Sequence, residues 1–352
     1  MKSIGLFLLL LTWSGWAQVE QLDGTLIKPK QIDRIVEKLL VYGKVEGIAL
    51  AIIHGNKASV KAYGERNKSP RQLLDPITVM PAGDLSEPII AYLVLKLAES
   101  GQIDLDKPLH EYLDAQTTGV AQKALGSEIG KKITVRHCLS HTSGLTERDT
   151  ILAFEPGTRY AQSAIDYVLL QAVLERISGK PLEKLASEKV FRPFDMVQSG
   201  FGPIPDAEDN RSVGYDKTGH PVDANPSGMY TTLLDYSRFV QKILLHQGLA
   251  PTWRNEMIKP QIEIETAPGS TQLYQALGWG FFKSQYGRAF FSQSQDAIFG
   301  HYVICFPDKN KAFIVMTNSA NGPSVFKELL EKVIADDQTP WEPLGFIPYK
   351  YP

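Results

Sequence analysis

The sequence predicts a mixed α/β (α+β) fold: one antiparallel sheet built from both termini, with a helical lobe inserted between its halves. Runs with the composition of β-strands occur at 46–64 and return only from residue 277 onwards. The intervening residues 85–200 are mostly helical in pattern. Because strands from the two ends must pair to complete one sheet, we expect the inserted helices to form a second lobe, with a cleft between the lobes.

The first elements follow from local patterns. Apolar residues recur at helical spacing in 31–43, which predicts a helix ending at Gly43. The β-rich runs EGIALAIIHG and ASVKAYG follow, separated by Asn56 and Lys57, and they predict a hairpin with these two residues in the turn. The late strands are expected in LGWGFF at 277–282, HYVICF at 301–306 and AFIVMTN at 312–318.

The N-terminus has the pattern of a cleavable signal peptide. One cation, Lys2, precedes an apolar stretch at 4–13, and small residues follow it. The apolar stretch is shorter than the roughly 20 residues that a spanning helix needs. We therefore expect residues 1–17 to be removed, a mature chain from Gln18, and an exported protein, periplasmic or secreted, without a stable membrane span.

Composition limits the partners. The 352 residues are 43% hydrophobic, enough for a large core, and the formal net charge is −2. Without a basic run or an RNA-binding aromatic signature, nucleic acid is excluded as an expected partner. Cys138 and Cys305 form no disulfide framework and are expected to be small buried residues.

The predicted organisation has three parts after the signal peptide. The sheet lobe comprises about 18–83 and 225–335, and the helical lobe comprises about 84–224. Residues 336–352, TPWEPLGFIPYKYP with a short lead-in, are rich in Pro and aromatics. We expect this C-terminal arm to lie extended on the body of the protein.

Several stretches resemble, in order, the serine β-lactamase-like family, which includes class C β-lactamases, DD-peptidases of the penicillin-binding-protein type and related esterases. They are LAESGQIDLDKPLHEYL, ITVRHCLSHTSGL, FEPGTRY, DYVLLQAVLERISGKPLEKLASEKVFRPFDM, GYDKTGHP, PSGMYTTLLDYSRFV and FIVMTNSANG. The resemblance spans about residues 22–335 and implies a β-lactamase/transpeptidase-like fold.

Catalysis in that family uses three motifs around the cleft: Ser-x-x-Lys, Tyr-x-Asn and Lys/His-x-Gly. The serine attacks a carbonyl, the lysine and tyrosine move the proton, and backbone amides hold the oxyanion. Aligning the flanking sequence places Asp84 and Glu87 in the serine and lysine places. Gln162 and Ala164 fall in the tyrosine and asparagine places.

The third motif falls in the variable loop SQSQDAIFG. If Gly300 closes this loop, then Ser294, Gln295 and Asp296 take the Lys/His-x-Gly places. The resemblance therefore implies that all three motifs are degenerate in this chain.

Asp84 and Glu87 allow two interpretations. Asp-x-x-Glu before an apolar helical run, with Pro88 in the first turn, is close to a capping box. Residues at i and i+3 on a helix are also roughly 5–6 Å apart at Cβ, so the pair could work as nucleophile and acid, as in glycosidases. Asp296 could add a third carboxylate from the facing strand. Clustered carboxylates could also hold Ca²⁺ or Mg²⁺, although no spaced ligand motif supports a metal site.

Other serines offer no better nucleophile. Ser86 is about 200° around the helix from Asp84 and faces away from it. Ser163 lacks a basic partner in its motif, and the resemblance places Ser140 and Ser143 in a structural loop. A relocated serine therefore has no visible base.

The sequence leaves three functions open: a non-hydrolytic binding protein for a glycan or peptidoglycan-type ligand, a carboxylate-dependent hydrolase using Asp84, Glu87 and Asp296, and residual acyl transfer. The first is favoured, and no cofactor is expected. The candidate ligand-binding residues are Tyr160, Gln162, Ser163, Tyr230, Ser294 and Gln295. Trp279 and Phe281 are also near the expected cleft but should be packed rather than exposed.

Overall fold

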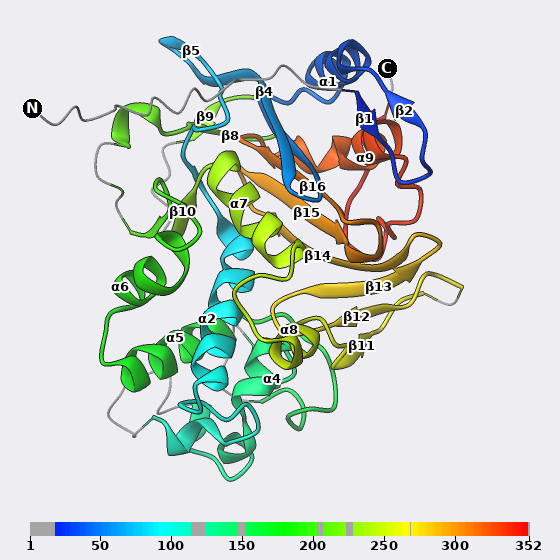
Figure 1. Cartoon of the computed structure of the whole chain (residues 1–352). Helices are drawn as coiled ribbons and strands as arrows, with labels where there is room; N and C mark the ends of the chain where they lie inside the picture. Colours follow the sequence, from blue (N-terminus) through cyan, green and yellow to red (C-terminus); the bar gives the residue numbers. More distant parts are fainter. Residues whose placement is uncertain are drawn as a thin grey trace, which may run out of the picture.

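A nine-stranded antiparallel sheet dominates the computed structural model (Figure 1), in the order β11-β12-β13-β14-β15-β16-β3-β4-β5. The structure describes residues 18–113, 124–146, 152–202, 204, 207–222, 228–267 and 269–350. The N-terminal and C-terminal halves of the sheet meet where β3 pairs with β16, with Ile48 opposite Thr317. The predicted fold class is therefore confirmed.

The sheet strands are β3 (Gly47–His54), β4 (Lys57–Lys68), β5 (Arg71–Leu73), β11 (Ile262–Ile264), β12 (Leu273–Gln275), β13 (Gly280–Ser284), β14 (Gly287–Gln295), β15 (Gly300–Phe306) and β16 (Lys311–Thr317). The predicted hairpin is β3–β4, but Lys57 already pairs with His54, so the turn is Gly55–Asn56. The strand predicted at 277–282 begins only at Gly280.

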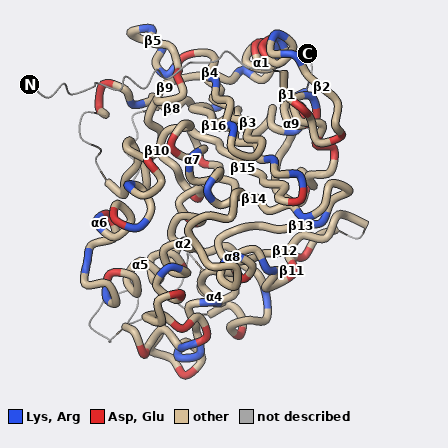
Figure 2. The backbone as a smooth tube through the Cα atoms, in the orientation of Figure 1, with Lys and Arg blue, Asp and Glu red and all other residues tan. Residues whose placement is uncertain are grey.

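Both faces of the central strands are covered, which explains their continuous apolar runs. Alternate residues of β3 enter different cores: Ala49 and Ala51 pack with the helical lobe, whereas Ile48 and Leu50 pack on the opposite face. That opposite face is covered by α1 (Pro29–Tyr42) and α9 (Phe326–Ile334). Figure 2 shows few charged residues on β15 and β16, in keeping with this burial.

The helix predicted at 31–43 is α1, which starts two residues earlier, at Pro29. The other helices are α2 (Glu87–Glu99), α4 (Val135–Leu139), α5 (Ala164–Ser178), α6 (Leu182–Ala186), α7 (Leu233–Leu244) and α8 (Pro251–Met257). Since α7 contacts β3 and β16, it covers the sheet face that meets the helical lobe.

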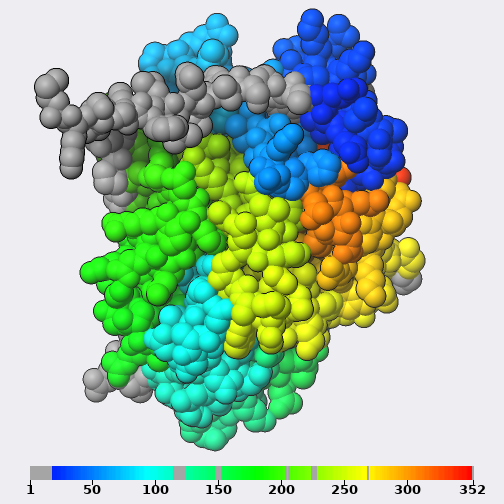
Figure 3. Space-filling view, viewed as in Figure 1, coloured from blue at the N-terminus to red at the C-terminus, as the bar shows by residue number. Residues whose placement is uncertain are grey.

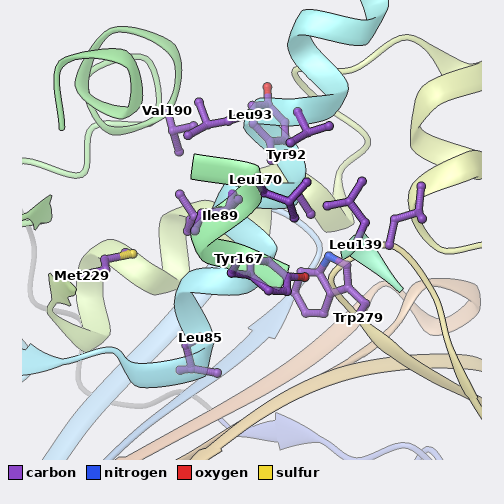
Figure 4. Packing of buried hydrophobic residues seen from close by; sticks show 14 of the residues in the cluster. Leu85, Ile89, Tyr92, Leu93, Leu139, Tyr167, Leu170, Val190, Met229 and Trp279 are labelled. Carbon is purple, nitrogen blue, oxygen red and sulfur yellow. The ribbon is translucent and has the colours of Figure 1, made fainter. Parts of the chain in front are cut away.

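Helix α2 is buried almost all round, as expected for a helix between two lobes. Figure 4 shows Ile89 and Leu93 of α2 with Leu170 of α5 and Val190. Trp279 is fully buried in the same core, and Phe281 is buried beside it, as predicted. Both cysteines are buried and free, also as predicted.

Short strands connect the lobes. β6 (Met80–Pro81), β10 (Met229–Thr231) and β7 (Gly200–Phe201) form a three-stranded sheet in the order β6-β10-β7 that leads into α2. Two hairpins complete the described strands: β1 (Val19–Glu20) with β2 (Leu26–Ile27), and β8 (Gly214–Tyr215) with β9 (Pro221–Val222).

The C-terminal arm lies on the face of the sheet that α9 covers. Trp341 and Phe346 are buried there, with ring centroids 5.3 Å and 5.9 Å from Tyr302 of β15. Figure 3 shows the N-terminal segment (blue) beside the orange C-terminal strands. In the ranges described, no helix is long and apolar enough to cross a membrane. The predicted signal peptide, residues 1–17, is outside these ranges.

Candidate functional site

The structure brings residues from the three predicted motif places together at the start of α2. A short 3-10 helix, Gly83–Ser86, carries Asp84 immediately before α2. The Asp84 carboxylate accepts a hydrogen bond from Gln162 Nε2 at 3.1 Å, and its backbone N–H donates to Ser294 Oγ at 3.1 Å. The residues that the alignment assigned to separate motifs are therefore in direct contact.

Gly83 allows β14 to approach this turn closely. It has a φ of 54°, and a Cβ at this position would lie 2.0 Å from Ser294 Oγ. Ser294 is buried at the end of β14. Its hydroxyl therefore lies against the turn and accepts the N–H of Asp84.

The capping-box interpretation of Asp84 and Glu87 is wrong. Because the 3-10 helix precedes α2, the N-cap residue is Ser86, which makes no side-chain capping bond. The Glu87 amide donates to the backbone carbonyl of Asp84 rather than to its carboxylate. Both carboxylates therefore contact side chains of the helical lobe instead of backbone N–H groups of α2.

Glu87 contacts a buried histidine that is itself backed by an aspartate. His141 Nε2 lies 3.3 Å from Glu87 Oε1, and Nδ1 lies 3.3 Å from Asp166 Oδ2. The side chains of Glu87, His141 and Asp166 are 14%, 2% and 0% exposed. The loop after α4 presents His141, with a left-handed φ of 51°, and the first turn of α5 presents Asp166. A positive φ is costly for a residue other than glycine, and such strain is concentrated at functional sites.

The charges around His141 keep its ring protonated. Burial alone lowers the pKa of an imidazole, but the charge of Glu87 and hydrogen bonds to Asp166 and Glu87 outweigh it, raising the His141 pKa to about 10. Burial raises the pKa of Asp166, and the hydrogen bond from His141 opposes that rise. At neutral pH the protonated ring therefore lies between the side chains of Glu87 and Asp166.

The surroundings of Asp84 disfavour its charged form, whereas those of His141 favour the charged form. Burial, followed by the negative charge of Glu87, raises its pKa to about 6, although His141 and the Gln162 hydrogen bond partly compensate. Near neutral pH this group gains or loses a proton readily. The two neighbouring acidic side chains therefore have different partners. Glu87 pairs with the His141 ring, and Asp84 accepts a hydrogen bond from the Gln162 amide.

Asp296 turns into its own loop. Its Oδ1 accepts the backbone N–H groups of Ile298 at 2.7 Å and Phe299 at 2.6 Å. Its charge still contributes to the raised pKa of Asp84. In the structure Asp296 thus stabilises its own loop. The sequence had suggested it only as a catalytic partner of Asp84 and Glu87.

The other predicted ligand residues are at varied distances from Asp84. Tyr160 is half-buried, with its ring centroid 6.0 Å from that of His141. Ser163 is fully buried, and its backbone N lies 3.3 Å from His141 Nδ1. Gln295 is exposed at the end of β14. Tyr230 is buried on β10 and lines a separate cavity.

Sequence reasoning missed His141 and Asp166. His141 belongs to SHTSGL, which the resemblance presents as a structural loop, and Asp166 opens the apolar run DYVLL. An acid at the start of an apolar helical run, two residues after the Tyr-x-Asn place, was the available signal. Of the described residues, no three His, Cys, Asp or Glu side chains are arranged to hold a metal ion.

The chain matches one family model and several known proteins in sequence. The family model described as Beta-lactamase matches residues 32–336. D-alanyl-D-alanine-carboxypeptidase/endopeptidase AmpH of Escherichia coli (strain K12) is 24% identical over 331 residues, covering 82% of this chain and 83% of that protein. N-acetylmuramyl-L-alanine amidase of Bacillus subtilis (strain 168) is 22% identical over 436 residues, covering 98% and 97%.

Two solved structures share the fold. The β-lactamase/D-alanine carboxypeptidase from Pseudomonas syringae has a TM-score of 0.75 at 17% identity, covering 88% of this chain and 98% of its own. The octameric penicillin-binding protein homologue from Pyrococcus abyssi has a TM-score of 0.74 at 19% identity, covering 84% and 74%. With a family model matched over most of its length and the motif places gathered at one site, the chain belongs to the Beta-lactamase family.

Proposed function

We propose that this protein binds a glycan or peptidoglycan-type ligand at the Asp84 site without acyl transfer. The observation that carries the proposal is the pair at the start of α2: Asp84 and Glu87 occupy the places that the resemblance assigns to serine and lysine. An exported protein, periplasmic or secreted, fits the apolar N-terminal segment.

The contacts of the site support this proposal. Acyl transfer of the family type needs a hydroxyl nucleophile with an adjacent base and free oxyanion donors. The carboxylate of Glu87 is paired with protonated His141 instead of acting as a base. The Asp84 amide already donates to Ser294, so an incoming carbonyl oxygen would have to displace that hydroxyl.

The ligand class is supported by the names of the relatives. Those names refer to D-alanyl-D-alanine and N-acetylmuramyl-L-alanine groups. The side chains at the site are carboxylate, amide, hydroxyl and phenol groups, which suit hydrogen-bonding to sugars and peptides. We take loss of hydrolysis with retained recognition as the function that best fits these groups.

Two measurements on the mature protein test this function. Incubation with a fluorescent penicillin, followed by intact mass measurement, should give no covalent adduct, whereas a muropeptide should raise the melting temperature. Gln162→Ala should weaken that shift, because it removes the amide that contacts Asp84. A stoichiometric adduct at any serine, or hydrolysis of the muropeptide, would refute the proposal.

A carboxylate-dependent hydrolase is the second candidate, and the raised pKa of Asp84 favours it. A carboxyl with a pKa of about 6 can donate a proton near neutral pH, and the Glu87 carboxyl lies close to it beside His141. This candidate expects turnover of a glycoside by the wild type and its loss in Asp84→Asn and Glu87→Gln. If a broad panel of α- and β-linked glycosides is bound but not cleaved, the binding function stands.

A further inference from the structure

A cavity of about 630 Å³ lies between α5, α6, β7 and β10. Val79 and Tyr230 line it, and Tyr230 pairs with Pro81, which is three residues before Asp84 in the chain. Gln171 of α5 also lines it, nine residues after Gln162 on the segment that bears the site. The cavity and the site at Asp84 therefore share α5 and the β6–β10 pair as their framework.

The walls of the cavity combine apolar surfaces with charged groups. Phe201, Leu182 and Ile204 supply apolar surface. The Arg211 guanidinium stacks 4.6 Å from the centre of the Tyr230 ring and donates from Nη2 to its hydroxyl at 2.8 Å. A mixed lining of this type is typical of small-molecule sites, in which a few polar groups orient the ligand.

Two of the acidic residues in the lining, Glu175 and Glu183, are held in place by hydrogen bonds from backbone N–H groups, and Glu175 also by the Gln171 side chain. Glu175 Oε1 accepts the N–H of Leu182 at 2.8 Å and an N–H of Gln171 at 3.1 Å. Glu183 Oε2 accepts the N–H of Phe201. Within the part of the chain that the structure describes, their other carboxylate oxygens accept no hydrogen bond and can receive one from a ligand.

The described lining of the cavity carries more acidic than basic side chains. Among its described residues, Glu175, Glu183 and Glu208 provide three carboxylates and Arg211 one guanidinium. Oriented acceptors of this kind favour ligands that donate hydrogen bonds, such as hydroxyl or amine groups, and disfavour anions.

We propose that this cavity is a binding subsite for sugar units that are uncharged or carry a free amine, and that they extend from the ligand held at Asp84. This inference rests on the proposed binding function and makes it more specific. The size of the cavity accommodates a sugar unit, and its acceptors match hydroxyl donors. An oligosaccharide would gain affinity with length as additional units enter the cavity.

Calorimetry on the mature protein tests the subsite with N-acetylglucosamine oligomers of increasing length, their deacetylated counterparts, and an anionic oligogalacturonate. Deacetylated oligomers should bind most tightly at low salt and anionic ones least. Gln171→Trp, which fills the cavity from an exposed helix position, should weaken binding of the long oligomers about tenfold or more and leave the shortest unchanged. Gln102→Trp, exposed and outside the lining, is the matched control.

A second variant, which removes one charge from the lining, tests the subsite even if Gln171→Trp does not fold. Glu208→Gln should reduce the preference for deacetylated oligomers, whereas Glu263→Gln, an exposed glutamate on β11, should not. Equal binding of the anionic oligomers, or equal effects of each variant and its control, would overturn the subsite.

The outcomes separate the subsite from the proposed function. If Gln162→Ala weakens a muropeptide while Gln171→Trp weakens no oligomer, the subsite inference fails and the proposed function stands. If Gln171→Trp abolishes oligomer binding that Gln162→Ala leaves intact, the cavity binds sugar on its own and the proposed site at Asp84 fails. If the wild type binds no member of either set, both fail.

Discussion

Asp84 is held in the folded protein in a way that disfavours its charged form. Burial and the neighbouring Glu87 raise its pKa to about 6, whereas an aspartate in an unfolded chain has a pKa of about 3.9. The folded state therefore binds this proton more tightly than the unfolded state. By linkage, the contribution of Asp84 to the free energy of unfolding falls as the pH rises from about 4 to about 6.

The first prediction concerns Asp84→Asn. It should leave stability nearly unchanged at pH 4, where Asp84 is protonated in the folded protein and as neutral as asparagine, and raise the free energy of unfolding by roughly 1–3 kcal/mol at pH 7. Urea denaturation of both proteins across this pH range measures the difference. An identical pH dependence in the two proteins would mean that Asp84 is ionised freely in the folded state.

Glu87 and His141 should depend on each other. Removing one partner of a buried ion pair leaves an uncompensated charge, so Glu87→Gln should lower the free energy of unfolding by about 3 kcal/mol. In a double-mutant cycle with His141→Gln, the coupling should exceed about 1 kcal/mol. Glu128→Gln, at the exposed pair with Lys131, should change stability little. Additive effects of the two buried substitutions would contradict the pairing.

At the scale of elements, the site depends on how closely β14 approaches the turn before α2. At this contact Ser294 Oγ, near the end of β14, accepts the N–H of Asp84, and Gly83 provides the space because it has no side chain. The approach explains why β14 makes contact with the 3-10 helix although the two are more than two hundred residues apart. The start of α2 is consequently determined by the sheet as much as by its own sequence.

Gly83→Ala tests this approach. Alanine at this φ of 54° adds backbone strain, and its Cβ would lie 2.0 Å from Ser294 Oγ, so we expect a loss of about 2–4 kcal/mol in the free energy of unfolding. In a Ser294→Ala background the loss should shrink towards about 1 kcal/mol, the strain alone. Gly101→Ala has a φ of 74° with open space around it and shows the strain without the clash. Equal losses at the two glycines, measured by urea denaturation, would contradict the close approach.

At the scale of the whole molecule, the C-terminal arm supports the sheet behind the site. Gln293, the neighbour of Ser294, donates from Nε2 to the carbonyl of Leu344 at 3.3 Å. Trp341 and Phe346 pack against Tyr302 on the adjacent strand. The arm is therefore part of the core on that face rather than a separate module.

Trp341→Ala should accordingly lower the free energy of unfolding by about 3 kcal/mol, because a buried indole is replaced by a cavity. Ile347→Ala provides the control within the arm, since Ile347 is 80% exposed and should contribute almost nothing. Thermal and urea denaturation of the two variants give the comparison. A Trp341→Ala protein as stable as Ile347→Ala would show that the arm does not stabilise the core.

Sequence periodicity alone was enough for the sheet built from both termini, the helix over 31–43 and the buried Trp279. These features depend on neighbouring residues and on the faces they share, which local patterns report. Strand β14 was missed because its sequence, GRAFFSQSQ, changes from aromatic to polar residues and lacks one consistent alternation. The motif places stay a prediction, which rests on flanking segments that align in order.

Only the tertiary structure decided what Asp84 and Glu87 contact. The sequence suggested a capping box, but the 3-10 helix before α2 moves Asp84 out of the N-cap position. His141 is 54 residues from Glu87 and 25 from Asp166 along the chain. No local pattern encodes a contact across such separations, because it arises from how α2, α5 and the loop after α4 pack together. The protonation of His141 follows from that arrangement, since the same imidazole buried without the two carboxylates would be neutral.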